Sequence, residues 1–154
     1  MPSHHLSAVV QHAHTDALVV HCSDHRFQAG HHEFLNLALK LGENYDLLSL
    51  PGGAQALALV EYLPKFAWAG WKWIHFLIDQ HGLKRVILIA HQDCGWYKFL
   101  PTFLHAMADP RAKQEDDLRR IREMLLKENH ELRVELYYAA FDPSDRLVME
   151  AISD

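Results

Sequence analysis

The sequence is poor in cysteine, with two in 154 residues, and it has no long apolar run. Two cysteines cannot build the disulfide framework of a small secreted domain, so we expect free thiols and a cytoplasmic protein. Apolar segments such as residues 86–90 are far too short to cross a bilayer. The first ten residues lack the basic flank and apolar core of a signal peptide. We therefore expect no membrane partner.

Basic residues are also in short supply: 15 Lys and Arg stand against 20 Asp and Glu, a formal net charge of −5. This balance lacks the positive surface that a nucleic-acid-binding protein needs. A hydrophobic content of 49% in 154 residues is enough for one buried core, so we expect a single domain over residues 1–154. Histidine, by contrast, is abundant at 13 residues, although composition alone is weak support for metal binding.

Short apolar runs alternate with segments of helical periodicity. The predicted strands cover residues 17–21, 45–50, 85–90, 133–141 and 146–152, and the predicted helices cover 31–41, 54–63, 68–81 and 114–129. We expect the first three helices to end at Gly42, Pro64 and Gly82, respectively. Strands separated by helical crossovers predict a single α/β domain with a mainly parallel central sheet flanked by helices.

Two segments rich in reactive side chains follow predicted strands: HCSDHR at residues 21–26 and AHQDCGW at 90–96. Ligands of such sheets bind beyond the carboxyl ends of the strands. The spacing of His91 and Cys94 lets both side chains reach one ion, and Cys22 offers a third ligand from a neighbouring strand. Two thiolates and an imidazole suit tetrahedral zinc with its fourth position open, as in catalytic sites.

Each of these residues has a simpler interpretation when it is taken alone. Cys22 is a common type of small buried residue, and His91 could be a hydrogen-bonded structural histidine. A transient disulfide between the two cysteines and an ordinary surface ion pair of Asp24 with Arg26 are further alternatives. The joint placement of both cysteines at strand ends beside such partners favours the metal site.

The two segments together resemble the signature of the β-class carbonic anhydrases. The matching motifs are C-x-D-x-R, formed by Cys22, Asp24 and Arg26, and H-x-x-C-G, formed by His91, Cys94 and Gly95. The resemblance extends over residues 16–152, nearly the whole chain. It implies the fold of that family, an α/β domain whose metal site lies at the ends of the strands.

The resemblance also implies a function, a zinc-dependent carbonate dehydratase that reversibly hydrates carbon dioxide to bicarbonate by a zinc-bound hydroxide. In this interpretation Cys22, His91 and Cys94 hold Zn²⁺, while Asp24 accepts a hydrogen bond from the hydroxide. Arg26 holds Asp24 ionised, although in some family members the aspartate binds the metal instead. A homodimer or a higher homo-oligomer is expected.

Several points stay open at the level of sequence. The stretch at residues 50–54, Leu-Pro-Gly-Gly-Ala, replaces the family's usual Arg-Asn-Ala-Gly, which puts the substrate pocket in doubt. A hydrolase for carbon disulfide or carbonyl sulfide and a zinc-holding but catalytically idle protein are the alternative functions. Asp93 is either a second support of the site or a turn cap. The residue that carries protons to buffer is one of four histidines: His21, His25, His31 and His32.

Overall fold

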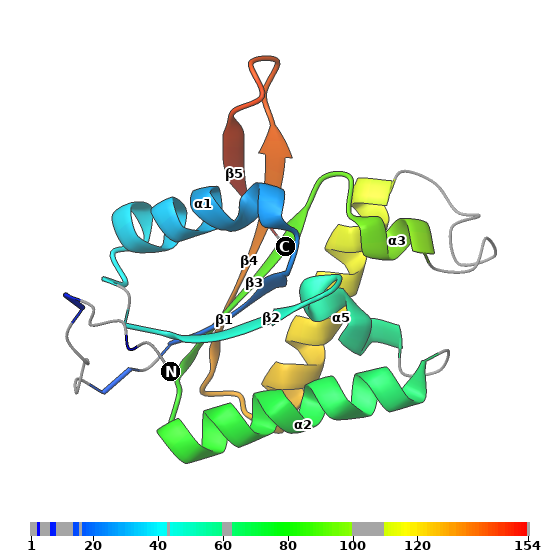
Figure 1. Ribbon diagram of the computed structural model, residues 1–154. Coiled ribbons are helices and arrows are strands. Elements are labelled where there is room, and N and C mark those ends of the chain that lie inside the picture. The colour runs from blue at the N-terminus through cyan, green and yellow to red at the C-terminus, as the bar shows by residue number, and fades with distance from the viewer. Residues whose placement is uncertain are drawn as a thin grey trace.

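The computed structural model describes residues 3, 7–8, 14–15, 17–42, 44–59, 63–99 and 110–153. Five strands form one sheet in the order β2-β1-β3-β4-β5 (Figure 1). The strands are β1 (Ala17–Cys22), β2 (Asp46–Leu50), β3 (Arg85–His91), β4 (Arg133–Phe141) and β5 (Leu147–Ala151). The first four are parallel, and β5 returns antiparallel to β4. The predicted fold class, an α/β domain with a mainly parallel sheet, is confirmed.

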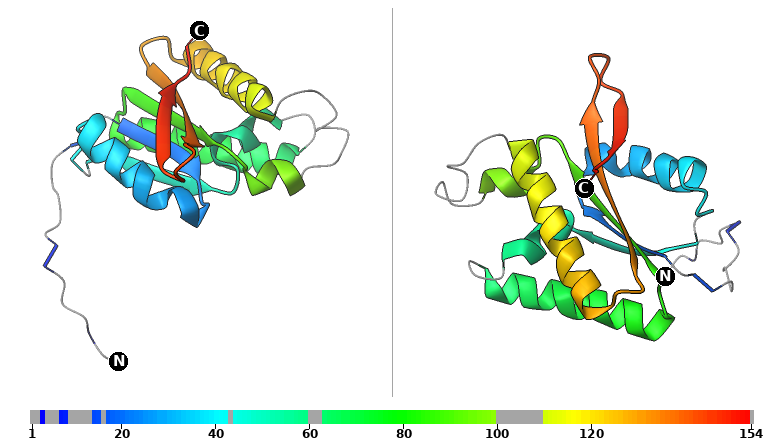
Figure 2. Two further views of the ribbon diagram at one scale, coloured as in Figure 1. Left: turned by 90° about the horizontal axis from the view of Figure 1, so that it is seen from above. Right: turned by 180° about the vertical axis from the view of Figure 1, so that it is seen from behind.

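Helices cover both faces of this sheet (Figures 1 and 2). They are α1 (His25–Glu33), the π-helical turn η1 (Phe34–Ala38), the 3₁₀ helix η2 (Gly53–Leu59), α2 (Pro64–His81), α3 (Gly95–Phe99) and α5 (Pro110–Glu128). Side chains alternate along β1, so Leu18 and Val20 enter the core under α2 and α5, whereas Val19 packs with Phe27 of α1. Two apolar cores therefore hold the sheet from opposite faces.

Within the described part of the chain, no helix combines the length and the apolar character that crossing a bilayer would require.

The start of α1 differs from the prediction. The helix begins at His25 rather than at residue 31, because Asp24 caps it: the Asp24 carboxylate accepts a hydrogen bond from the backbone N–H of Arg26. The end also differs, because the π-helical turn closes at Ala38, before the expected stop at Gly42. Asp24, to which the resemblance gave a catalytic role, thus also sets where the first helix begins.

Pro64 begins a helix instead of ending one. The predicted helix 54–63 is a 3₁₀ helix over Gly53–Leu59, and residues 60–62 of that prediction lie outside the described part. Pro64 occupies the first turn of α2, where its missing N–H leaves no hydrogen bond unmade and its fixed φ suits the helix. The predicted end of this helix is confirmed, since Gly82 caps it in the left-handed conformation.

The loop after β2 lies directly against the end of β1. Gly53 has a φ of +56°, and a Cβ atom there would lie 3.0 Å from the backbone nitrogen of Cys22. It would lie equally close to the carbonyl carbon of His21, so backbone surrounds this position. Only glycine brings the two segments into this contact without strain.

We expect Gly53→Ala to destabilise the protein more than Gly42→Ala. Both glycines have nearly the same positive φ, +56° and +58°, but a Cβ at Gly42 meets nothing within 4 Å. The left-handed backbone costs alanine about 1–2 kcal/mol in both variants. The clash at Gly53 should lower the free energy of unfolding by about 1–3 kcal/mol more. Urea unfolding followed by circular dichroism measures both variants, and equal losses would contradict the close contact.

Candidate metal centre

Parallel pairing of β1 with β3 brings the two reactive segments to one edge of the sheet. The strands pair from Ala17 opposite Arg85 onward, so both carboxyl ends lie at the same edge. Cys22 ends β1, His91 ends β3, and Cys94 follows in the turn before α3. The ligand atoms of these three residues all lie within 4.8 Å of one another, and all three side chains are buried. In the described part of the chain, no other group of three or more such side chains meets this criterion.

His91 presents one ring nitrogen to this group. Its Nδ1 lies 2.8 Å from the carbonyl oxygen of Gln92. Because a carbonyl can only accept, Nδ1 carries the hydrogen and Nε2 keeps its lone pair. That Nε2 is buried and has no hydrogen-bond partner. An imidazole that is oriented by a carbonyl through its other nitrogen is typical of metal ligands.

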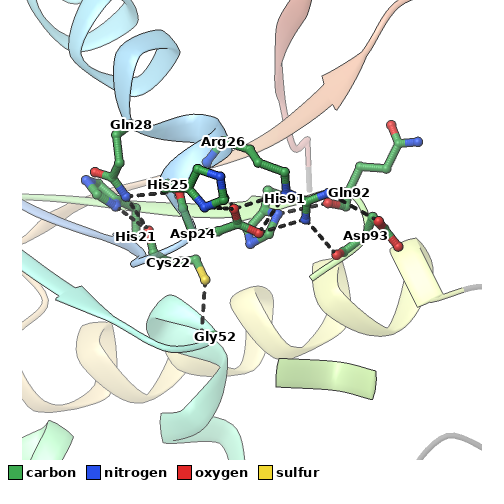
Figure 3. Close-up of polar contacts among 10 residues, drawn as sticks. All are labelled: His21, Cys22, Asp24, His25, Arg26, Gln28, Gly52, His91, Gln92 and Asp93. Atoms are coloured by element: carbon green, nitrogen blue, oxygen red, sulfur yellow. Dashed lines mark hydrogen bonds and ion pairs between the residues drawn. The ribbon is translucent and has the colours of Figure 1, made fainter. Parts of the chain in front are cut away.

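The two cysteine side chains pack against each other. Cys94 donates a hydrogen bond to Cys22, which lowers the pKa of Cys22 well below its ordinary value. The same contact and burial raise the pKa of Cys94. The backbone N–H of Gly52 also donates to the Cys22 sulfur, over 3.3 Å (Figure 3). Two buried sulfur atoms and an imidazole nitrogen form a donor set that could hold a metal ion.

Gly52 was missed as a site residue in the sequence. Residues 50–54 were noted as a departure from the family's motif and not as part of the site, yet this loop supplies a backbone donor to the Cys22 sulfur. The feature of the sequence that could have indicated Gly52 is the Pro51-Gly52-Gly53 turn directly after a predicted strand. A Cβ at Gly52 would lie 2.4 Å from Cδ1 of Trp96, so the indole packs directly on this loop. Trp96 also contacts the cluster of Cys22 and Cys94, and it forms an apolar wall beside the thiols.

Tyr97 links the centre to α5. Its ring packs with the two cysteines, and its hydroxyl donates to the carboxylate of Asp117, 2.5 Å away. Asp117 is itself buried and forms an ion pair with Lys113 one turn earlier in the helix. Burial and the neighbouring carboxylate raise the pKa of Tyr97, so the hydroxyl keeps its proton and remains a donor. This buried hydrogen bond fixes α3, and with it Cys94, against α5.

Asp24 and Arg26 form a two-pronged pair beside the metal ligands (Figure 3). The Nε of Arg26 lies 3.1 Å from Oδ1 of Asp24, and one Nη lies 2.7 Å from Oδ2. These hydrogen bonds are the main reason why the pKa of Asp24 falls to about 2. Asp24 is not one of the three residues whose ligand atoms converge. Its carboxylate is held by Arg26 instead.

Asp93 gives Arg26 a second anchor. The Nη1 of Arg26 lies 3.3 Å from the Asp93 carboxylate, and its Nη2 donates to the Asp93 carbonyl oxygen over 3.2 Å. Asp93 also pairs with Lys98 of α3. Of the two interpretations that the sequence left open, the contacts place Asp93 as a support of the Asp24–Arg26 pair. Arg26 thereby ties the start of α1 to the turn after β3.

The four histidines that the sequence could not separate lie in two environments. His21 and His31 are buried, with ring centroids 4.5 Å apart, and burial lowers the pKa of His31 to about 3. His25 and His32 lie on the exposed side of α1. The His25 side chain is 94% exposed, and its Nδ1 is 3.9 Å from Oδ1 of Asp24.

Comparison with known proteins identifies the fold. Neither a protein-family model nor a curated protein matches the chain. Among solved structures, it is similar to carbonic anhydrase from Streptococcus mutans, with 16% identity and a TM-score of 0.59 over 91% of this chain and 82% of that one. Two β-carbonic anhydrases of Aspergillus fumigatus are also similar. CafA has 15% identity and a TM-score of 0.55, over 91% of this chain and 76% of its own. CafD has 14% identity and a TM-score of 0.52, over 90% of both chains. The chain therefore has the β-carbonic anhydrase fold.

We expect Arg26→Met to raise the pKa of Asp24. Methionine keeps much of the length of arginine but removes the charge and the donors that hold this pKa at about 2. The carboxyl group should then titrate about 1–3 pH units higher. Because the folded-state pKa is depressed in the wild type, the pair stabilises the fold above about pH 4, and this contribution is lost as the pH falls through the folded value.

Carboxyl-carbon NMR as a function of pH measures this change. The matched control is Arg146→Met, which removes an exposed arginine from the turn between β4 and β5. An Asp24 titration that is the same in the Arg26 variant and in the control would contradict the role given to Arg26.

Proposed function

We propose that the protein is a zinc-dependent carbonic anhydrase, that is, a carbonate dehydratase that reversibly hydrates carbon dioxide to bicarbonate. One observation carries this proposal: a buried group of Cys22, His91 and Cys94 lies beside an Asp24 carboxylate that Arg26 keeps ionised. The fold, which the chain shares with the carbonic anhydrases of similar structure, supports it. A purely structural metal site would have no use for the ionised pair.

The donor set supports zinc as the metal. Three protein ligands, two of them thiols, leave a fourth position of a tetrahedral ion open, as catalytic zinc sites do. When it is bound, zinc supplies acidity, because it lowers the pKa of a coordinated water towards neutrality. The unpaired Nε2 of His91 and the convergence of the three ligand atoms within 4.8 Å support an arrangement that can hold an ion.

The remaining residues of the site have separate tasks in the proposal. The ionised Asp24 accepts a hydrogen bond from the attacking water, which turns a lone pair of that water towards the carbon of the substrate. Arg26 keeps Asp24 ionised and holds it away from the metal ligands. The indole of Trp96 offers an apolar surface beside the thiols, where a small non-polar molecule such as carbon dioxide can lie.

A related substrate is the second candidate. Carbon disulfide and carbonyl sulfide are linear like carbon dioxide, and the same residues would serve their hydrolysis. One observation favours this candidate: the loop at which the sequence departs from the family's motif packs directly against Trp96 beside the thiols, where a substrate would lie. Activity assays of the zinc-loaded protein with each substrate separate the two candidates.

We propose further that the protein is a cytoplasmic homo-oligomer. Free thiols at the metal centre are compatible with a reducing compartment. The aromatic side chains on the outer face of α2 support self-association: Phe66, Trp68, Trp73 and Phe76 are 60%, 65%, 48% and 60% exposed in the single chain. Aromatic residues are enriched at protein interfaces, and a second copy of the chain would cover them.

We expect the protein to bind one zinc ion per chain. Chelator-treated protein that is reloaded with zinc should reach this ratio by elemental analysis. Cys94→Ser removes a thiolate and should weaken binding by more than about 100-fold, since loss of even an outer partner of a zinc ligand costs about 10–100-fold. His32→Ala, on the exposed side of α1, is the control and should bind normally. Reduced wild-type protein that takes up no zinc would contradict the site.

We expect Asp24→Asn to abolish most carbon dioxide hydration while zinc stays bound. Asparagine can still cap α1 but cannot carry the negative charge. Stopped-flow hydration should show a fall in kcat/KM of at least about 100-fold. Asp145→Asn is the matched control, since it makes the same change in an exposed turn with a φ of +58°, a conformation that asparagine tolerates.

The same assay tests the rival functions. Unchanged hydration in the Asp24 variant would contradict the role of this carboxylate. Zinc-loaded wild-type protein that hydrolyses carbon disulfide or carbonyl sulfide but leaves carbon dioxide untouched would replace the proposed substrate. Zinc-loaded protein that acts on none of the three would overturn the enzyme proposal.

A further inference from the structure

We infer that the indole N–H of Trp96 donates a hydrogen bond to an oxygen atom of bicarbonate at the metal centre, which makes Trp96 a specificity-determining residue. This inference rests on the proposed function, and it names the group that recognises the oxyanion. Trp96 lies outside both motifs, which end at Arg26 and at Gly95. A buried donor without an acceptor, held beside the two cysteines, carries the inference.

Trp96 packs against both loops that carry the cysteines of the centre. Its side chain contacts the cluster of Cys22, Cys94 and Tyr97. Its backbone N–H forms a hydrogen bond to the Cys94 sulfur. A Cβ atom at Gly52 would lie 2.4 Å from Cδ1 of the indole, and the N–H of Gly52 donates to the Cys22 sulfur. The position of the indole is therefore set by both of the loops that position the sulfur atoms.

The edge of the indole that meets the Gly52 loop is also the edge that carries its donor. Cδ1 is bonded directly to Nε1, so the N–H of Trp96 lies on the side of the ring that faces Gly52. Nε1 is buried and has no hydrogen-bond partner among the described residues. Leaving a buried donor without an acceptor is unfavourable, and nearly all such groups in folded proteins are paired. An acceptor that binds at the centre would remove this cost.

The surroundings separate Trp96 from Trp71, whose indole Nε1 is likewise buried and unpaired in the described part of the chain. Trp71 belongs to α2 and packs against the apolar core on that face of the sheet. Trp96 instead packs with two of the three side chains whose ligand atoms converge. An unpaired indole N–H therefore occurs both in an apolar core and beside possible metal ligands, and Trp71 is the internal control for Trp96.

Other donors around the centre are already engaged. The guanidinium of Arg26 binds two carboxylates. The Tyr97 hydroxyl donates to a carboxylate of α5. The N–H of Gly52 donates to a ligand sulfur, and residues 50–54, Leu-Pro-Gly-Gly-Ala, have no side-chain donor. The indole of Trp96 differs from these groups because its N–H is available to a ligand.

This donor suits bicarbonate better than carbon dioxide. The oxygen atoms of bicarbonate carry negative charge, and hydrogen bonds to ionised acceptors are roughly twice as strong as those between neutral groups. As water adds to the carbon of carbon dioxide, negative charge develops on the oxygen atoms of the substrate, and a donor that is already in place stabilises it. Sulfur accepts hydrogen bonds more weakly than oxygen, so the same N–H favours these reactants over their sulfur analogues.

The experiment follows the binding of sodium bicarbonate to zinc-loaded, ¹⁵N-labelled protein by NMR. In the wild type, the indole N–H resonance of Trp96 should move downfield as bicarbonate is added, because its proton gains a charged acceptor. The indole resonance of Trp71 should stay in place. The spectrum of Trp96→Phe assigns the resonance, since this substitution removes the Trp96 indole signal.

Two variants measure how much the hydrogen bond contributes. Trp96→Phe keeps an apolar ring but has no N–H, so the dissociation constant of bicarbonate should rise about tenfold or more. The backbone amide of Gly52 reports binding in every protein, because it lies beside the centre. Trp71→Phe makes the same change at the other buried indole and should bind bicarbonate as the wild type does. Elemental analysis checks that each variant carries one zinc ion per chain.

Equal dissociation constants in the wild type and in zinc-loaded Trp96→Phe would overturn the inference. So would a Trp96 indole resonance that stays in place while the Gly52 amide reports binding. This second measurement uses the wild type alone, so it decides the question even if Trp96→Phe fails to fold or to load zinc. Wild-type protein that hydrates carbon dioxide without moving the indole resonance would contradict the inference and leave the proposed function standing. An indole shift in protein that hydrates no carbon dioxide would do the reverse.

Discussion

The parallel pairing of β1 with β3 is the constraint on which the site depends. Cys22 and His91 are 69 residues apart in the chain, yet both end strands that run side by side in the same direction. Backbone hydrogen bonds between these buried strands fix their register, and with it the position of both strand ends at the edge of the sheet. Cys94 then needs only the short turn after β3 to reach the same point. A sheet in which these strands were antiparallel would place the two motifs at opposite edges.

Arg26 is a second organising element, and its action is electrostatic. Its planar guanidinium contacts Asp24 on one side and Asp93 on the other, which joins the start of α1 to the turn that carries Cys94. Two tasks meet in this side chain, since it keeps Asp24 ionised and also fixes the spacing of the two motif segments. Lysine could not replace it fully, because a single ammonium group lacks the fork of donors that holds both partners.

Burial divides the polar groups of this edge by function. The side chains of Cys22, His91 and Cys94 are buried, and the Nε2 of His91 has no hydrogen-bond partner among the described residues. The apolar ring of Trp96 closes one side of the centre. Asp24 and His25, in contrast, lie at the start of α1, where the protein meets solvent. A buried group of possible metal ligands and a solvent-exposed helix start thus lie within a few residues of each other.

The sequence by itself was sufficient for the class of fold, the five strands and the expectation that Cys22, His91 and Cys94 lie together. Apolar runs such as residues 85–90 indicate buried strands, and closely spaced motifs indicate shared sites, because both depend on residues that are near one another in the chain. Tertiary structure decided the rest. The donation from Gly52 to Cys22 and the anchoring of Arg26 by Asp93 join segments that have no shared pattern in the sequence. Pro64 was misread as a helix end, and the role of Asp24 as a helix cap was not predicted, because the helical periodicity of the sequence placed the first helix start at residue 31. His25 could be told apart from His21 and His31 only by burial, which depends on how α1 packs on the sheet and not on neighbouring residues in the chain.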